Sequence, residues 1–172
     1  MRAVGYEHPD AVTLIAEVQQ EYVKRYGGTD KTPLDPGQFN PPDGLFVVGY
    51  LRAVPVVCGG WRAHDSDNPQ FLDGDAEIKR MYVAPRARGR GLARALLAEL
   101  ERTAASAGRR RMVLETGRAQ PEAIALYLSS GYTDVPKFGV YREEEGSICY
   151  GKLLLAHGSS TGFSLRVDAP TV

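Results

Sequence analysis

Two glycines and three arginines share the segment 86–93, whose sequence is RARGRGLA. It lies between an alternating polar and apolar stretch, typical of a strand, and a stripe of leucines typical of a helix. The first turn of a helix exposes N–H groups without intrahelical partners, and the helix dipole there attracts anions. Gly89 and Gly91 leave the backbone open to an approaching ligand, and the arginines add charged donors. The segment therefore predicts a cradle for a pyrophosphate group.

Other functions of this segment are weaker predictions or are excluded. Two glycines before a helix can simply form a tight turn, and the spacing alone leaves that alternative open. A dinucleotide-binding loop is excluded because Arg94 stands where its third glycine would fall, and no Gly-Lys-Ser/Thr ending marks a nucleoside triphosphate loop. A nucleic-acid patch could combine these arginines with Arg109–Arg111, but short charge runs are usually solvated.

Hydrophobic periodicity and turn residues divide the rest of the chain into elements. Strands are expected at 45–50, 54–61, 76–83, 111–116, 138–141 and 148–155. Helices are expected at 11–22 with Asp10 as cap, from Leu92 to a stop at Gly108, and from Pro121 to Leu128. The segment 26–44 is rich in Gly and Pro and predicts a long irregular stretch, which in compact domains is usually functional or mobile.

The order of these elements predicts the fold class. Strand, helix, strand, helix and strand follow one another in the middle of the chain, which requires at least one parallel pair joined by a crossover helix. Hairpins on either side predict antiparallel neighbours, so the fold is α/β with a mixed, mostly antiparallel sheet flanked by helices. We find no internal repeat, and expect one domain over 1–157 and a tail over 158–172.

The chain resembles the GNAT superfamily of N-acetyltransferases in two places. Arg86-x-x-Gly89-x-Gly91 after a strand is similar to the family's Arg/Gln-x-x-Gly-x-Gly/Ala signature. The segments 123–127 (AIALY) and 131–132 (GY) resemble its Ala-x-x-Leu-Tyr…Gly-Phe/Tyr element. The likeness covers 76–132 and implies an enzyme that moves an acetyl group from acetyl-CoA to a primary amine by direct attack in a ternary complex.

The resemblance also implies positions for the cosubstrate. The backbone of the signature turn would hold the CoA pyrophosphate. The end of the preceding strand would pair with the pantetheine arm, where the strand splays from 113–115 and leaves a gap for the thioester. Gln120 stands where the family often has Asn, which weakens that expected contact. The cofactor-binding residues expected are Met81, Tyr82, Val83, Arg88, Gly89, Arg90, Gly91, Leu92, Ala93, Gln120 and Tyr127.

The chemistry of acyl transfer needs a base and an acid. An alkylamine has a pKa of about 10 and must lose a proton before it attacks. Glu77 is the predicted base, with Glu115 as the alternative and a structural ion pair with Lys79 or Arg80 as the competing interpretation. Tyr127 is the predicted general acid for the CoA sulfur, as the resemblance implies; its alternative is an aromatic packing residue. Cys58 has no nearby His in sequence, which disfavours an acyl-cysteine intermediate.

The acceptor is less well defined. Aromatic residues near the irregular stretch and the late strands could form a wall for a cation or a ring, although most aromatics simply pack. These residues are Tyr22, Tyr26, Phe39, Trp61 and Tyr141. A small-molecule amine is favoured over a protein acceptor. Two further functions stay open, a CoA-binding module without activity and, less favoured, a nucleic-acid-binding domain.

Composition sets the remaining expectations. The 172 residues are 43% hydrophobic, and 21 Lys and Arg balance 21 Asp and Glu, so neither nucleic acid nor an anionic membrane is an expected partner. No apolar run is long enough for a signal peptide or a membrane span. Two cysteines and three scattered histidines favour no metal site. We therefore expect a cytoplasmic protein, and a homodimer is compatible with exposed late strands.

Overall fold

The computed structural model describes residues 1–65 and 68–155 as an α/β fold. The predicted tail, 158–172, lies outside the described residues. The strands are β1 (Arg2–Val4), β2 (Gly44–Leu51), β3 (Val54–His64), β4 (Asp75–Val83), β5 (Arg111–Gly117), β6 (Thr133–Asp134) and β7 (Ser147–Leu153). The helices are α1 (Pro9–Tyr26), α2 (Leu92–Ser106) and α3 (Pro121–Ser129), with short 3-10 turns η1 (Pro36–Phe39) and η2 (Pro85–Ala87).

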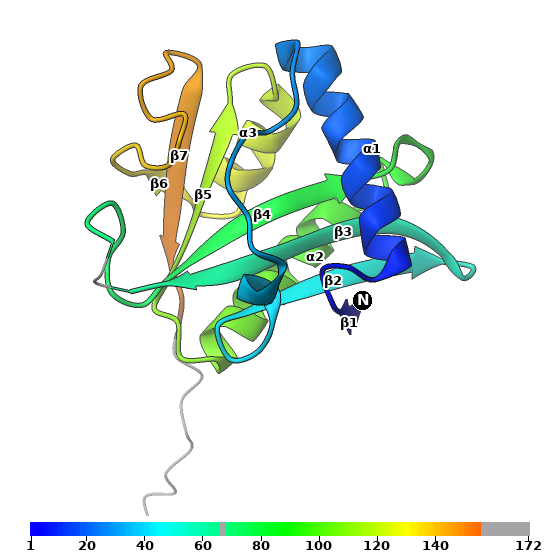
Figure 1. Ribbon diagram of the computed structural model, residues 1–172, viewed down its shortest axis with the longest axis horizontal. Helices are drawn as coiled ribbons and strands as arrows, with labels where there is room; N and C mark the ends of the chain where they lie inside the picture. Colours follow the sequence, from blue (N-terminus) through cyan, green and yellow to red (C-terminus); the bar gives the residue numbers. More distant parts are fainter. Residues whose placement is uncertain (66–67, 156–172) are drawn as a thin grey trace, which may run out of the picture.

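The strands form one sheet in the order β1-β2-β3-β4-β5-β7-β6. Neighbours are antiparallel except β4 and β5, which are parallel and are connected through α2 (Figure 1). Only a crossover helix can return the chain to start a parallel strand at the same edge. The predicted mixed, mostly antiparallel sheet with a central parallel pair is therefore confirmed.

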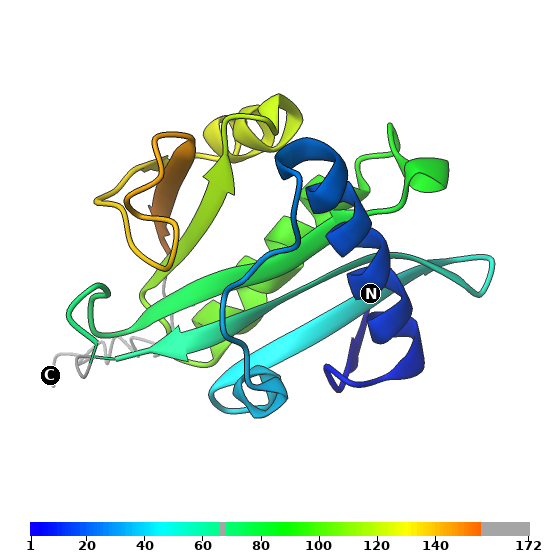
Figure 2. The ribbon, with the colours of Figure 1, turned by 45° about the horizontal axis from the view of Figure 1, so that its top comes forward.

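Helices cover both faces of the sheet, and each face has its own core. One face packs against α1 and η1 through a cluster that includes Leu14, Phe39 and Phe46. The other packs against α2, whose Leu96, Leu97 and Leu100 are buried, and against α3. Figure 2 shows α1 and α2 on opposite sides of the strands. A site in the middle of this sheet is thus enclosed by helices on both sides.

α1 begins two residues before and ends four residues after the predicted bounds. Its cap is His8, whose Nδ1 accepts a hydrogen bond from the Asp10 N–H at 3.2 Å, so Asp10 is a first-turn residue and not the cap predicted. Gly27 ends the helix in the left-handed conformation, with φ of 75°. The chain then turns back across the sheet as the irregular segment that the sequence predicts.

The predicted strand at 138–141 is wrong. These residues form bends and turns, and the short strand that pairs with β7 is β6, at 133–134. Pro136 lacks the N–H that a sheet ladder needs, and Gly139 has φ of 79°, so the backbone leaves the sheet before Phe138. β1 is a further strand that the sequence analysis missed, because three residues are too few for a periodic pattern.

β4 and β5 separate soon after they pair. Their parallel register covers only Asp75–Arg111, Ala76–Met112 and Glu77–Val113, after which the strands diverge (Figure 1). A bulge between β3 and β4 accompanies this divergence, with Arg80 at φ of 55°. A bulge bends and twists its strand, so β4 turns away from β5 at this point. The separation opens the middle of the sheet.

Candidate active site

A cavity of about 680 Å³ fills the gap between the diverging strands. Side chains alternate between the two faces of each strand, so the cavity has two unlike halves. On the α2 and α3 side its wall is apolar, with Ile78, Met81, Leu114, Ala123 and Tyr127. On the α1 side its wall is polar and charged, with Asp30, Lys79, Arg80, Glu115 and Tyr141. The gap therefore connects an apolar compartment with a charged one through the sheet.

The segment 86–93 has the geometry of an anion cradle. Gly89 and Gly91 have φ of 74° and 72°, a conformation that favours glycine, and a Cβ at either would meet no atom within 4 Å. Gly91 precedes α2, no side chain caps the helix, and its first turn holds no acidic residue. The unpartnered N–H groups of this turn face open space, which suits the pyrophosphate of CoA.

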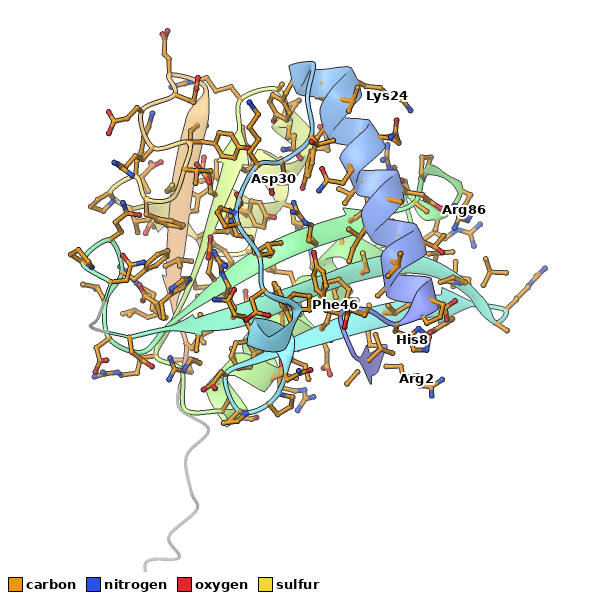
Figure 3. The ribbon with its side chains drawn as sticks, viewed as in Figure 1. Arg2, His8, Lys24, Asp30, Phe46 and Arg86 are labelled. Atoms are coloured by element: carbon orange, nitrogen blue, oxygen red, sulfur yellow. The ribbon has the colours of Figure 1, made fainter. Side chains whose placement is uncertain are left out.

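Two of the three cradle arginines are held by the protein itself. Arg86 donates to the backbone carbonyl of Pro55 at 2.8 Å and forms an ion pair with Glu17 of α1 at 3.3 Å. Arg88 donates to the carbonyl of Val83 and lies 3.7 Å from Glu21 of the same helix. Figure 3 shows Arg86 beside α1. These arginines connect the turn to α1 through Glu17 and Glu21.

The predicted general acid Tyr127 lies in the apolar half of the cavity. Its side chain is 7% exposed and packs against the rings of Tyr132 and Tyr150. Its hydroxyl contacts only the weakly accepting sulfur of Met81, at 3.8 Å. Burial raises the pKa of Tyr127 above its ordinary value, so the phenol is protonated at neutral pH. A protonated hydroxyl without a strong acceptor can donate to a ligand in the cavity.

Glu77, the predicted base, does not line the cavity. It is 1% exposed, and its carboxylate binds Arg62 Nε and His64 Nε2, both at 2.8 Å, and Lys79 Nζ at 2.7 Å. Burial raises the pKa of Glu77, but Lys79, His64 and Arg62 outweigh burial and hold it far below the ordinary range. A carboxylate with this many cationic partners is a poor proton acceptor, and the geometry favours the competing interpretation, an ion pair with Lys79.

Glu115, the alternative base, lines the cavity from β5. Its carboxylate accepts a hydrogen bond from Ser147 Oγ at 2.7 Å and forms no ion pair among the described residues. Burial raises the pKa of Glu115, and the Ser147 hydrogen bond offsets only part of that effect. A partly buried carboxyl group with a raised pKa suits proton transfer near neutral pH.

Asp30 ties together three parts of the chain over the charged half of the cavity. It forms an ion pair with Arg80 on the bulge and accepts hydrogen bonds from Thr32 and, at 3.1 Å, from the Tyr141 hydroxyl. Burial raises the pKa of Asp30, but Arg80, the two Thr32 hydrogen bonds and Lys79 together outweigh burial, and the pKa lies below its ordinary value. Figure 3 shows Asp30 on the segment that crosses in front of the gap. The segment 27–32 thus closes the cavity on the α1 side.

Of the other residues expected to bind the cofactor, Met81 and Gln120 line the cavity, whereas Tyr82 and Val83 lie at the end of β4. Met81 lies on the cavity wall, whereas Tyr82 turns its hydroxyl toward Glu17 at 3.3 Å, so only its backbone is free to face a ligand. Val83 continues the same strand into the cradle. Gln120 lines the cavity at the start of α3 and donates to the Tyr26 hydroxyl at 2.9 Å.

The aromatic residues predicted for an acceptor wall fall into two groups. Tyr22, Tyr26 and Tyr141 line the cavity. Phe39 and Trp61 are buried in the core, at 1% and 2% exposure. Sequence reasoning missed Asp30 and gave Lys79 and Arg80 no place in the site. The sequence signal for Lys79 and Arg80 was a pair of adjacent cations in the middle of the strand 76–83.

The described residues show no features of a metal centre or a membrane anchor. No three His, Cys, Asp or Glu side chains of 1–65 and 68–155 are grouped to hold a metal ion. Within the same ranges no helix combines the length and the apolar character that crossing a membrane requires.

A mixed sheet whose central parallel strands diverge beside an uncapped glycine turn is compatible with an acyltransferase that uses a CoA-type cosubstrate. The sequence profile of the acetyltransferase (GNAT) family matches residues 13–132. An IAA acetyltransferase of Azospirillum brasilense is 35% identical over 143 residues, which are 83% of this chain and 90% of that protein. The chain belongs to the acetyltransferase (GNAT) family.

Solved structures agree with this assignment. A Klebsiella pneumoniae protein assigned as an acyl-CoA N-acyltransferase has a TM-score of 0.70 at 28% identity, over 90% of this chain and 96% of that chain. The PaiA N-acetyltransferase of Thermoplasma acidophilum, solved in complex with coenzyme A, has a TM-score of 0.53 at 16% identity, over 64% and 61% of the two chains. The second likeness concerns the fold alone.

Proposed function

We propose that this protein transfers an acetyl group from acetyl-CoA to a primary amine by direct attack in a ternary complex. One observation carries the proposal: a single cavity through the sheet presents the Tyr127 hydroxyl on its apolar side and the Glu115 carboxylate on its charged side. An acid and a base on opposite sides of one gap fit a reaction in which one proton is removed and another is supplied.

The cradle and the free edge of β4 support acetyl-CoA as the donor. The backbone N–H groups of 89–93 would hold the pyrophosphate, since the Arg88 N–H already donates to the Pro85 carbonyl at 3.3 Å, and the edge of β4 from Met81 to Val83 has no partner strand toward β5. An extended pantetheine arm can pair with such an edge as a strand does. The IAA acetyltransferase relative supports acetyl as the acyl group. When bound, the thioester supplies an activated acetyl group at the narrow part of the gap.

The two cavity residues have complementary proton roles. Glu115, directly or through water, accepts the proton that the attacking amine loses as its nitrogen bonds to the carbonyl carbon. Tyr127 donates a proton to the sulfur as the C–S bond breaks. A backbone N–H near Val83 stabilises the developing oxyanion. We thus move the proposed base from Glu77 to Glu115, because of these two candidates only Glu115 lines the cavity, and it forms no ion pair among the described residues.

Closure of the cavity supports a small-molecule acceptor over a protein. Asp30, Arg80 and Tyr141 hold the 27–32 segment over the charged half, so a protein side chain would have to displace these bonds to enter. Cys58 is buried in β3, and burial raises the pKa of its thiol well above the ordinary value. A thiol held in this way is a poor nucleophile, which supports direct transfer without an acyl-cysteine intermediate.

The alternative of nucleic-acid binding receives little support. Each arginine of the two basic runs except Arg90 is paired with a carboxylate of the protein, which leaves little free positive charge. The pairs are Arg86–Glu17, Arg88–Glu21, Arg109–Asp65, Arg110–Asp73 and Arg111–Asp75. The expected cytoplasmic location and homodimer stay predictions, which cell fractionation and light scattering would test.

Calorimetric titration with acetyl-CoA, NAD and ATP, followed by thiol release with a panel of amines, tests the proposal. We expect selective binding of acetyl-CoA and thiol release that depends on an amine. Binding of acetyl-CoA without turnover of any amine would favour the alternative of a CoA-binding module. Failure of the folded protein to bind acetyl-CoA would overturn the assignment of the cavity.

A further inference from the structure

Lys79 and Glu115 occupy matched positions on the two sides of the gap. The last parallel pair of β4 and β5 is Glu77–Val113, and two residues further along each strand come Lys79 and Glu115. Because side chains on a strand alternate, both lie on the same face of the sheet as that pair. Both line the charged half of the cavity, and they form no ion pair with each other. A cation and an anion thus line the same half of the cavity from opposite strands.

The charge on each side of the gap is only partly compensated by the protein. On the β4 side, Lys79 and Arg62 together share one carboxylate, that of Glu77, which leaves a surplus of one positive charge. An ammonium group has three donors, and the Lys79 ammonium uses one of them on Glu77 at 2.7 Å. On the β5 side, the Glu115 carboxylate has the Ser147 hydroxyl as its hydrogen-bond donor. A negative centre and a positive centre are therefore both available to a ligand.

We propose that the acceptor is a small amino-carboxylic acid of the α-amino acid type, with its amine at Glu115 and its carboxylate on Lys79. The inference rests on the proposed function and names the acceptor class of that same site. A zwitterion satisfies both charged walls of the gap at once, whereas a simple amine leaves the spare donors of a 7% exposed lysine without an acceptor. Lys79 is then the specificity-determining residue.

Arg80, the neighbouring cation, does not fit this role. Its guanidinium is already engaged by Asp30, which also accepts hydrogen bonds from Thr32 and Tyr141. The Arg80 Nε atom is buried and has no hydrogen-bond partner among the described residues. Arg80 therefore binds the segment 27–32 through Asp30, and Lys79 is the residue that would bind the carboxylate of the acceptor.

Thiol release measured with α-amino acids and with the amines that lack only their carboxylate tests the inference. In the wild type we expect kcat/KM to be higher for the amino acid of at least one matched pair. Lys79→Met should lower kcat/KM for that amino acid by about 10- to 100-fold, the loss of one charge-assisted hydrogen bond, and change the matched amine by less than about threefold. Lys79→Arg should keep most of the preference.

Lys24→Met is the matched control, because it removes the same charge from an exposed position on α1. The Lys24 side chain is 72% exposed and points away from the sheet (Figure 3). It should leave the preference unchanged, and circular dichroism should show that all variants fold.

The possible results distinguish a failure of the amino-carboxylic acceptor from a failure of the proposed acetyltransferase activity. Equal or better turnover of the plain amines by the wild type, or an equal loss for both members of a pair in Lys79→Met, overturns the amino-carboxylic acceptor and leaves the acetyltransferase intact. Release of thiol with no member of either class overturns the acceptor inference. In that case, acetyl-CoA binding by calorimetry decides whether the donor site also fails.

Discussion

At the residue scale, the environments of three side chains set what each can do. Tyr127 is protonated and has no strong acceptor, Glu115 is partly buried without a cation, and Glu77 is buried among cations. The residue types alone do not separate the two glutamates, since a carboxyl group serves as a base or as a structural anion according to its neighbours.

Tyr127→Phe removes the proposed acid while it keeps the ring that packs against Tyr132 and Tyr150. We expect kcat to fall by about 10²-fold or more, with acetyl-CoA affinity nearly unchanged, because only proton transfer to the sulfur is lost. Steady-state kinetics and calorimetry measure the two quantities. Tyr150→Phe is the control, since Tyr150 packs in the same aromatic cluster outside the cavity lining. Unchanged turnover in Tyr127→Phe would remove the acid role.

Glu115→Gln tests the base. A base acts in its ionised form, so wild-type kcat/KM should fall as pH drops through the pKa of Glu115, which burial raises above its ordinary value. The variant keeps an acceptor for Ser147 and should lose this acidic limb together with about 10²-fold of kcat/KM. Glu143→Gln, at an 87% exposed side chain, should keep the wild-type profile. A wild-type limb that persists in Glu115→Gln would argue for another base.

At the element scale, the divergence of β4 from β5 and the uncapped start of α2 together create a place for a cosubstrate. Three paired residues fix the strands at one end, and the bulge at Arg80 turns them apart at the other. The same loop that ends β4 starts α2, so the cradle follows the strand that forms one wall of the gap. An elongated ligand that extends along β4 would pass from the gap to the turn.

Gly89→Val tests this path at the turn. A β-branched residue at positive φ is strained, and its side chain would occupy the open space in front of the backbone N–H groups. We expect acetyl-CoA affinity by calorimetry to fall by more than about tenfold, and stability to fall by about 1–3 kcal/mol. Gly108→Val is matched: its φ is 81°, a Cβ there also meets no atom, and it follows the other end of α2. It should lose similar stability and keep the affinity.

At the scale of the whole molecule, a buried charge network links the sheet beneath the site. Glu77 joins β4 to β3 through Arg62 and His64. Arg62 also reaches the Pro33 carbonyl at 3.2 Å and Gln38 at 2.9 Å, so the irregular segment is fastened to the same network. Glu77, the residue predicted from the sequence as the base, thus connects β4 to β3 and, through Arg62, to the irregular segment.

Glu77→Gln should destabilise the fold at neutral pH by about 3–5 kcal/mol, because it leaves buried cations without their carboxylate. The folded-state pKa of Glu77 is depressed below the unfolded value of about 4.3, so its stabilisation is complete above that value and is lost as pH falls through the folded pKa. Urea unfolding of both proteins at pH 7 and pH 4 measures the difference, which should remain at pH 4. A variant as stable as the wild type would contradict the network's structural role.

Local patterns in the sequence predicted much of the fold. Periods of two and of about 3.6 located five of the seven strands of the described residues and all three longer helices, and the glycine spacing located the turn that precedes α2. The predicted parallel pair followed from element order. The sequence analysis missed the short strands β1 and β6, because two or three residues are too few to show a periodic pattern. The strand predicted at 138–141 does not form, because Pro136 lacks an N–H and Gly139 has a positive φ.

The sequence by itself determined the strand–turn–helix cradle and the candidacy of Tyr127, because backbone conformation and helix-end electrostatics depend on neighbours along the chain. Only the tertiary structure decided which glutamate faces the cavity and which is neutralised, because Arg62 and His64 come from another strand. Only it placed Asp30 over the gap and Lys79 opposite Glu115. The charge state of a side chain depends on groups that folding brings near it, and no local pattern carries that information.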